Sequence, residues 1–217
     1  MKIVVTAGPT REHLDPVRFL SNPSTGKMGF AIAAEAARRG HDVTLVAGPV
    51  ALRTPKGVRR VDVVSAREML AACKKLLLPP PAVFISTAAV ADWRPAKCAV
   101  RKLKKREMSP TLKLVRNPDI LKTISRLLPH PSSLRLVGFA AETNDVLAEA
   151  ARKCREKGLS FIVANDVTQA GCGFGTDTNR VTFVFPDGTQ KKLPLLAKRL
   201  VAKRILDEVS RTSAPRA

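Results

Sequence analysis

Aromatic residues are scarce in this sequence: they make up 4% of the 217 residues, and tyrosine is absent. Proteins that bind single-stranded nucleic acid stack bases on exposed aromatic rings, so a chain with few rings has little material for such a surface. The formal net charge of +20 points the other way, because clustered Lys and Arg neutralise phosphates. The basic residues are spread along the whole chain, however, and a cationic protein also attracts small anions such as nucleoside triphosphates.

Cysteine and histidine are few as well. The chain has three histidines, and its four cysteines lie far apart with no C-x-x-C pair. A zinc site or a disulfide framework requires such residues in number and at characteristic spacings. We therefore expect free thiols in a reducing cytosol and no metal ion held by protein side chains.

Long apolar runs are missing. No apolar stretch approaches the roughly 20 residues that a membrane-spanning helix needs. The N-terminal apolar run stops at Gly8-Pro9, too early for a signal peptide. We expect a cytoplasmic protein without a membrane partner. The length of the chain suits one domain, which we expect to cover residues 1–217.

What the sequence does contain is a regular alternation of β-branched runs with Ala-rich or amphipathic segments. This alternation predicts an α/β fold, a Rossmann-like three-layer sandwich with a mostly parallel sheet. The segment from Val181 through Asp187-Gly188 predicts a C-terminal antiparallel hairpin. The other predicted strands are Lys2–Thr6, Asp42–Val46, Val61–Val64, Val83–Ser86, Leu134–Phe139 and Phe161–Ala164, and the predicted helices are Lys27–Arg39, Ser65 to before Pro79, Asp145–Lys157 and Pro194–Arg211.

Residues 94–111 interrupt the alternation. They are basic and poor in large apolar residues, which predicts a mobile flap. After the flap, Asn117 and Pro118 predict the N-cap and the first position of a further helix. Ligands of parallel sheets bind beyond the carboxyl ends of the strands. We therefore expect the site among loop 7–26, segment 87–93, the flap and the turn after Phe139.

Two common nucleotide motifs do not fit the first of these loops. There is no G-x-G-x-x-G after the first strand, and the next predicted strand has no acidic residue at its end to bind a ribose. A Rossmann-type oxidoreductase is thus a weak alternative. Gly26-Lys27 is not a P-loop either, because Met28 stands where that motif needs Ser or Thr.

Four further sequence features can be interpreted either as parts of a binding site or as ordinary structural features. The run Ser21–Gly26 leads into a helix N-terminus that can bind an anion, or Ser24 or Thr25 simply caps that helix. The basic run 101–105 is either a lid or a solvated charge cluster. Lys153 and Lys157 share a helix face and are either polyphosphate ligands or surface lysines. Asp92 binds a ribose or magnesium, or caps a helix.

The wording of these segments is more specific than their pattern. The string TAGPTREHLDPVRFLSNPSTGKMG at residues 6–29 resembles the opening of the phosphopantothenoylcysteine synthetase family. The resemblance covers nearly the whole chain in the expected order, and it continues through AAVADWRP (88–95), RKLKK (101–105), NPDI (117–120), GFAAET (138–143), AND (164–166) and GFGTDTNRV (173–181).

The resemblance implies a two-step ligase reaction. The carboxylate of 4′-phosphopantothenate attacks a nucleoside triphosphate to give an acyl-nucleotidylate, and the amine of L-cysteine then displaces the nucleoside monophosphate. The wording SNPSTGKMG is similar to that of bacterial members and favours CTP, with ATP as the alternative. The resemblance also implies Mg²⁺ carried by the triphosphate and a homodimer with its interface after Asp166. No flavin is expected, because no decarboxylase segment precedes Met1.

The resemblance assigns roles to particular residues. It implies that Asn22 holds the carbonyl region of the acyl-nucleotidylate, and that Lys102 is the flap lysine that turns this intermediate over. The residues that it implies for the nucleotide are Ser24, Thr25, Gly26, Ala88, Ala89, Asp92, Pro118, Asp119, Ile120, Leu121, Phe139, Lys153 and Lys157.

Overall fold

The computed structural model describes residues 1–107, 109, 111–127, 134–142 and 144–211. Its centre is an eight-stranded sheet in the order β13-β12-β10-β9-β6-β1-β4-β5. The strands from β5 to β10 pair in parallel, whereas β12 and β13 form an antiparallel extension at one edge. Their bounds are β1 Lys2–Ala7, β4 Asp42–Ala47, β5 Val58–Asp62, β6 Val83–Ser86, β9 Arg135–Glu142, β10 Phe161–Asp166, β12 Val181–Val184 and β13 Gln190–Lys192.

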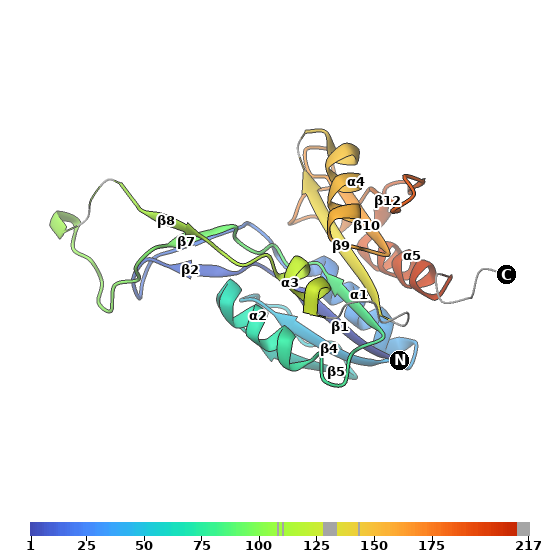
Figure 1. Cartoon of the computed structure of the whole chain (residues 1–217), viewed down its shortest axis with the longest axis horizontal. Helices are drawn as coiled ribbons and strands as arrows, with labels where there is room; N and C mark the ends of the chain where they lie inside the picture. Colours follow the sequence, from blue (N-terminus) through green and yellow to red (C-terminus); the bar gives the residue numbers. More distant parts are fainter. Residues whose placement is uncertain (108, 110, 128–133, 143, 212–217) are drawn as a thin grey trace.

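Helices cover both faces of the sheet (Figure 1). On one face α1 packs beside α5, and on the other lie α2, α3 and α4. Residues of β1 alternate between the two faces: Ile3 and Val5 join the α1 and α5 side, and Val4 joins the other. The predicted three-layer sandwich is therefore confirmed, and its helices are α1 Lys27–Arg38, α2 Ala66–Lys75, α3 Ile120–Leu127, α4 Val146–Glu156 and α5 Lys198–Arg211.

A second feature of the fold is an arm that extends from the sandwich (Figure 1). We use this name for the described residues of 11–21 and 93–116. The arm contains two antiparallel strand pairs, β2 with β3 and β7 with β8. The bounds are β2 Arg11–His13, β3 Phe19–Ser21, β7 Trp93–Pro95 and β8 Leu114–Arg116, with a short 3₁₀ helix at Lys105–Glu107.

The arm changes two expectations. The loop predicted over residues 7–26 contains the β2–β3 hairpin, in which the backbone of Arg11–His13 pairs antiparallel with that of Phe19–Ser21. The flap predicted over residues 94–111 begins in β7 and includes the 3₁₀ turn, and residues 108 and 110 of it lie outside the described residues. Its start is thus ordered by pairing with β8.

Several predicted element boundaries are wrong, and the structure gives a physical reason for three of them. The strand predicted at Val61–Val64 is β5, Val58–Asp62, because parallel pairing with β4 sets its register. The helix predicted from Pro194 begins at Lys198, since Leu196–Ala197 pairs as β14 with β11 at Thr178–Asn179. The cap of α3 is Asp119, whose carboxylate accepts a hydrogen bond from the Lys122 N–H at 2.9 Å.

Close approach of α1 to the sheet depends on Gly29. A Cβ atom at this position would lie 2.4 Å from Thr87 Oγ1 and 2.5 Å from the Cβ of Ala7. Overpacking of this kind forces neighbours apart, so Gly29→Ala is expected to lower the free energy of unfolding by about 1–3 kcal/mol. Urea denaturation measures the change. Gly175→Ala is the control because a Cβ there meets nothing within 4 Å; equal loss in both variants would contradict the packing argument.

Candidate active site

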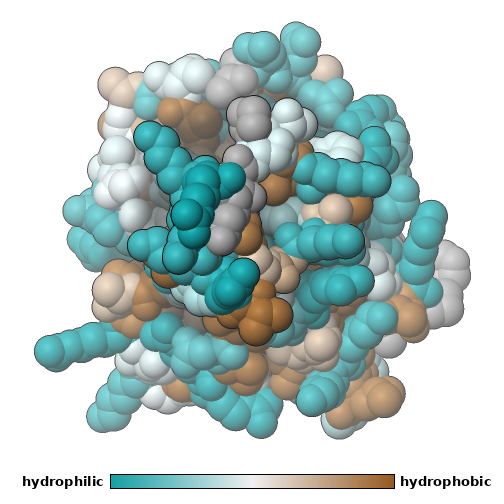
Figure 2. Space-filling model, turned by 90° about the vertical axis from the view of Figure 1, so that its left-hand side faces the viewer, coloured by the Kyte–Doolittle hydropathy of each residue, from teal (hydrophilic) through white to brown (hydrophobic). Residues whose placement is uncertain are grey.

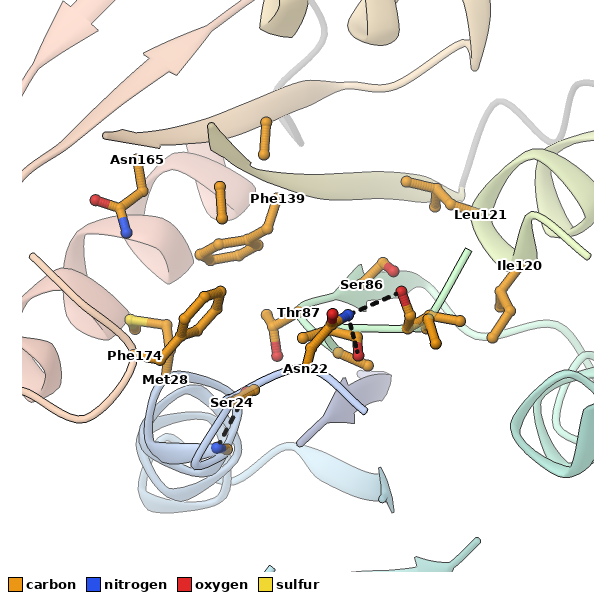
Figure 3. A pocket seen from close by; sticks show the side chains of 18 of the residues that line it. Asn22, Ser24, Met28, Ser86, Thr87, Ile120, Leu121, Phe139, Asn165 and Phe174 are labelled. Carbon is orange, nitrogen blue, oxygen red and sulfur yellow. Dashed lines mark hydrogen bonds between the residues drawn. The ribbon is translucent and has the colours of Figure 1, made fainter. Parts of the chain in front are cut away.

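One cavity of about 570 Å³ opens at the carboxyl ends of the parallel strands. Its wall comes from the start of α1, the segment after β6, the start of α3, the end of β9, α4 and the loop before β11 (Figure 3). Parallel sheets bind ligands at this edge because successive βα loops converge there. The sequence analysis placed the site at the same edge.

Every nucleotide residue implied by the resemblance lines this cavity, and so does Asn22. They come from separate segments that the fold brings together: Ser24, Thr25, Gly26, Ala88, Ala89, Asp92, Pro118, Asp119, Ile120, Leu121, Phe139, Lys153 and Lys157. Lys102 is the exception. It lies on the arm, exposed, and is not among the residues that line the cavity.

The N-terminus of α1 faces the cavity without a side-chain cap. Gly26 occupies the N-cap position with φ 78°, a left-handed conformation that favours glycine, and among the described residues no side-chain cap bond is made at this helix start. Thr25 does not cap the helix, because its hydroxyl donates to the Phe174 carbonyl at 2.8 Å. Ser24 Oγ accepts only a long bond of 3.4 Å from the Gly26 N–H. Uncapped N–H groups at a helix start are a suitable anion site.

Asn22 joins the first βα loop to the segment after β6. Its Nδ2 donates to the carbonyl oxygens of Ala89 at 3.1 Å and Val90 at 3.2 Å (Figure 3). Asn117 binds the same segment from the other side, since its Nδ2 donates to the Ala91 carbonyl at 2.8 Å. The amide nitrogen of Asn22 is thus already engaged, and a substrate oxygen would have to replace one of these carbonyls to receive its N–H.

The cavity lysines are partly neutralised by nearby carboxylates. Lys153 Nζ lies 2.5 Å from Glu142 Oε1, and Lys157 Nζ lies 2.8 Å from Asp119 Oδ2. Burial alone would raise the pKa of Asp119, but the Lys157 ammonium and the Lys122 N–H hold it below its ordinary value. Both lysines therefore line the cavity, in positions from which they could exchange a carboxylate for a phosphate.

The position of Lys102 is determined by its neighbour. The Leu103 N–H donates to Asp15 Oδ2 at 3.2 Å, and the Leu103 carbonyl accepts from Arg18 Nη2 at 2.8 Å. Asp15 is fully buried, and the hydrogen bonds from Arg18 keep the pKa of its carboxyl far below the ordinary range. The Asp15–Arg18 pair therefore binds both backbone polar groups of Leu103, the residue that follows Lys102.

Several polar or aromatic cavity residues were not among the predicted site residues, namely Lys27, Asn117, Glu142, Asn165, Phe174, Asn179 and Lys198. All of these except Lys198 belong to strings on which the resemblance was based, so the signal was present although no site function was attached to it. Lys198 lies in no such string. It reaches the cavity because β14 brings the start of α5 beside β11.

Two structural features bear on the expected partners. Among the described residues, no helix combines the length and apolarity needed to cross a membrane. Within the same residues, no three or more His, Cys, Asp or Glu side chains form a group that could hold a metal ion.

Residues 1–212 match the family described as the DNA/pantothenate metabolism flavoprotein C-terminal domain. The chain belongs to this family. It is 50% identical over 212 residues to the coenzyme A biosynthesis bifunctional protein CoaBC of Escherichia coli K12, and 45% identical over 212 residues to that of Bacillus subtilis. These matches cover 96% and 97% of this chain and 51% of each relative, so the chain spans about half the length of these curated relatives.

Solved structures support the family membership. The C-terminal domain of a CoaBC protein superposes with a TM-score of 0.80 at 43% identity, covering 97% of this chain and 94% of that one. A Cab2 mutant in complex with phosphopantothenate-cysteine shares the fold, with a TM-score of 0.75 at 16% identity and coverage of 97% and 86%. The resemblance to the synthetase family that the sequence motifs indicated is thereby confirmed.

Proposed function

We propose that this protein is a phosphopantothenate–cysteine ligase. The observation that supports this function best is the convergence on one cavity of residues that the resemblance assigned to a nucleotide, although they are scattered from Asn22 to Lys157 in the sequence. Relatives named for coenzyme A biosynthesis, at up to 50% identity, add weight to the proposal. We further propose that residues 1–217 form one catalytic domain.

The proposed reaction has two steps. A carboxylate oxygen of 4′-phosphopantothenate attacks the α-phosphorus of the nucleoside triphosphate, and the bond to the leaving pyrophosphate breaks. The amine nitrogen of L-cysteine then attacks the acyl carbon; the bond to the nucleotide phosphate breaks, and the amine loses a proton. Such a reaction requires positioning of the two substrates and stabilisation of negative charge on transferring groups.

The cavity provides both requirements. The start of α1 and the ammonium groups of Lys153 and Lys157 face the space where phosphates would lie, and the Phe139 ring offers a surface for a nucleobase (Figure 3). Asp92 is exposed at the cavity wall, where its carboxylate can accept a hydrogen bond from a ribose hydroxyl. In this proposal Asn22 holds the carbonyl region of the acyl-nucleotidylate.

Magnesium fits this arrangement as a companion of the triphosphate. Mg²⁺ is bound through substrate phosphates, water and one or two carboxylates, and three carboxylates line the cavity, at Asp92, Asp119 and Glu142. Two of these are paired with lysines, which leaves Asp92 as the carboxylate best placed to assist. When bound, the ion would offset phosphate charge.

The nucleotide is proposed to be CTP. Base selection in this cavity would depend on backbone groups near Ala88, Ala89 and Pro118, where the six-membered cytosine ring needs less room than a purine. Purified protein given equal CTP and ATP with 4′-phosphopantothenate and L-cysteine is expected to form CMP, detected by mass spectrometry. Formation of AMP in excess would replace CTP by ATP while leaving the ligase proposal intact.

The arm supports a homodimer. Figure 2 views the molecule from the arm end, where apolar side chains lie between hydrophilic ones. Val17 is 57% exposed, Trp93 45% and Leu112 42%, which is unfavourable for a monomer in water. We therefore propose that the arm contributes to the contact between two copies, in addition to the region after Asp166 that the sequence analysis favoured. Light scattering of the purified protein measures this state directly.

The excess positive charge is the only feature in favour of nucleic-acid binding. Binding of that kind would weaken steeply as salt rises, because counterions are released from the phosphates. We propose that nucleic acid is not a partner. A titration with a random duplex near physiological salt is expected to show no binding, and micromolar binding there would contradict this part of the proposal.

A further inference from the structure

Lys198 is a buried lysine at the cavity wall that no motif singled out. It is the first residue of α5, it is only 7% exposed, and it lines the cavity. A buried ammonium group is costly unless its three N–H groups are satisfied. No ion pair joins Lys198 to a carboxylate among the described residues, so the way in which it is satisfied is informative.

All of its hydrogen bonds go to one loop. Lys198 Nζ donates to the carbonyl oxygens of Thr176 at 2.6 Å, Phe174 at 3.2 Å and Gly173 at 3.4 Å. The Lys198 backbone N–H adds a bond to the Asp177 carbonyl at 2.9 Å. Lys198 therefore holds residues 173–177, which we call the GFGTD loop.

The opposite side of the GFGTD loop is held by the start of α1. The Thr25 hydroxyl donates to the Phe174 carbonyl, and Lys27 Nζ donates to the Gly175 carbonyl at 2.9 Å. The loop thus spans the N-termini of α1 and α5, two helices that pack side by side. The carbonyls of residues 173–176 all accept hydrogen bonds from side chains, and the donors outside the loop are Thr25, Lys27 and Lys198.

The loop brings an aromatic ring into the cavity. Phe174 lies at the same side of the cavity as Phe139 and Met28 (Figure 3). Gly173 lines the cavity with it. A shift of the loop would therefore move the wall against which a bound nucleotide packs.

Lys198 also differs from the other cavity lysines in the partners of its ammonium group. Lys27, Lys153 and Lys157 each lie within 2.8 Å of a carboxylate oxygen. Within the described part of the chain, the Lys198 ammonium donates hydrogen bonds to neutral carbonyls, and the nearby Asp177 carboxylate is paired with Lys27 at 2.7 Å. Burial, aided by the neighbouring Lys27 ammonium, lowers the pKa of Lys198, and the Asp177 carboxylate opposes this shift only in part. Its field is weakly screened by solvent and acts on any anion that enters.

We propose that Lys198 is a positioning residue for the nucleotide. It fixes the GFGTD loop so that Phe174 forms one wall of the cavity, and it supplies to the triphosphate a positive charge that is in no direct ion pair among the described residues. The inference rests on the proposed function, because it requires that a nucleoside triphosphate occupies this cavity.

Calorimetric titration with CTP and Mg²⁺ tests the inference without any turnover. Lys198→Met removes the charge and all three donors and is expected to raise Kd about tenfold or more, the effect of losing one close charge. Lys198→Gln keeps donors but not charge and should fall between Met and wild type, and Lys198→Arg should recover most of the affinity. Lys203→Met, at an exposed position of the same helix, is the matched control and should bind as wild type does.

A second ligand separates charge from packing. Cytidine lacks phosphates, so Lys198→Gln should weaken CTP binding much more than cytidine binding. Phe174→Leu, which leaves the Lys198 bonds in place, should weaken both ligands. If Lys198→Met does not fold, Lys198→Gln and Phe174→Leu still test the inference.

The outcomes separate two failures. Wild-type protein that binds neither CTP nor ATP would overturn the proposed function itself. Wild-type binding with unchanged CTP affinity in Lys198→Gln and Phe174→Leu would overturn the role of Lys198 alone. Equal weakening of CTP and cytidine in Lys198→Gln would likewise contradict its electrostatic part.

Discussion

Replacing Asn22 with aspartate is expected to lower kcat/KM for ligase turnover about 100- to 1,000-fold, the usual loss when one positioned amide donor is removed from an active site. The structure adds a reason of its own. Asn22 Nδ2 donates to the Ala89 and Val90 carbonyls, and a carboxylate oxygen at that place would meet two acceptors at 3.1–3.2 Å. The new negative charge would also repel the phosphates of both substrates.

Two further variants make this prediction sharper. Asn22→Ala removes the amide without adding charge, so the difference between Ala and Asp measures the repulsion. Asn144→Asp is the matched control, since Asn144 is exposed and is not among the cavity-lining residues. Steady-state kinetics under saturating nucleotide would record the changes, and wild-type kinetics in Asn22→Asp would remove this residue from the site.

Lys102→Gln is expected to leave the first step largely intact and to slow the cysteine step about 100-fold, as for loss of a cation that meets developing charge. The acyl-nucleotidylate should then accumulate and be detectable by mass spectrometry of quenched reactions. Lys105→Gln is the control because that lysine is equally exposed on the arm. Full overall turnover in Lys102→Gln would show that the lid assignment is wrong.

Because Lys102 lies on the arm, it could act in the cavity of its own chain or in that of the second copy of the proposed homodimer. The Asp15–Arg18 pair holds the adjacent Leu103, and Lys102 does not line the cavity of its own chain. In the proposed homodimer the arm of one copy could reach the other. A mixture of Lys102→Gln and Asn22→Asp chains, exchanged into mixed dimers, should regain about a quarter to a half of wild-type activity if Lys102 acts across the dimer. No recovery would place Lys102 in the cavity of its own chain.

The sandwich was predictable from sequence because its signals are local. The β-branched run at Lys2–Thr6 predicts a strand and the Ala-rich segment after Gly26 predicts a helix, each from a few neighbouring residues. The structure has β1 and α1 at these places. The boundaries that were missed depend on distant partners. β5 takes its register from β4, and Leu196–Ala197 joins a strand pair instead of the helix that its own pattern favours.

The residues of the candidate site likewise include some that the sequence could predict and others that it could not. Residues within specific strings, such as Ser24 and Phe139, could be assigned by resemblance, and the fold brings them to one cavity. Lys198 could not be found, because its function depends on carbonyl groups more than 20 residues away in the sequence. The Asp15–Leu103 contact spans 88 residues and was equally invisible. Asp119 was favoured only as a nucleotide contact, and its capping bond emerged from the structure.

The most direct test of the account is pyrophosphate release from the purified protein with Mg²⁺ and CTP or ATP. The account predicts sustained release only when both 4′-phosphopantothenate and L-cysteine are present, and with phosphopantothenate alone no more than about one equivalent per site. No release with either nucleotide, from protein shown to be folded, would contradict the proposed ligase. The fold and the cavity would then serve another reaction.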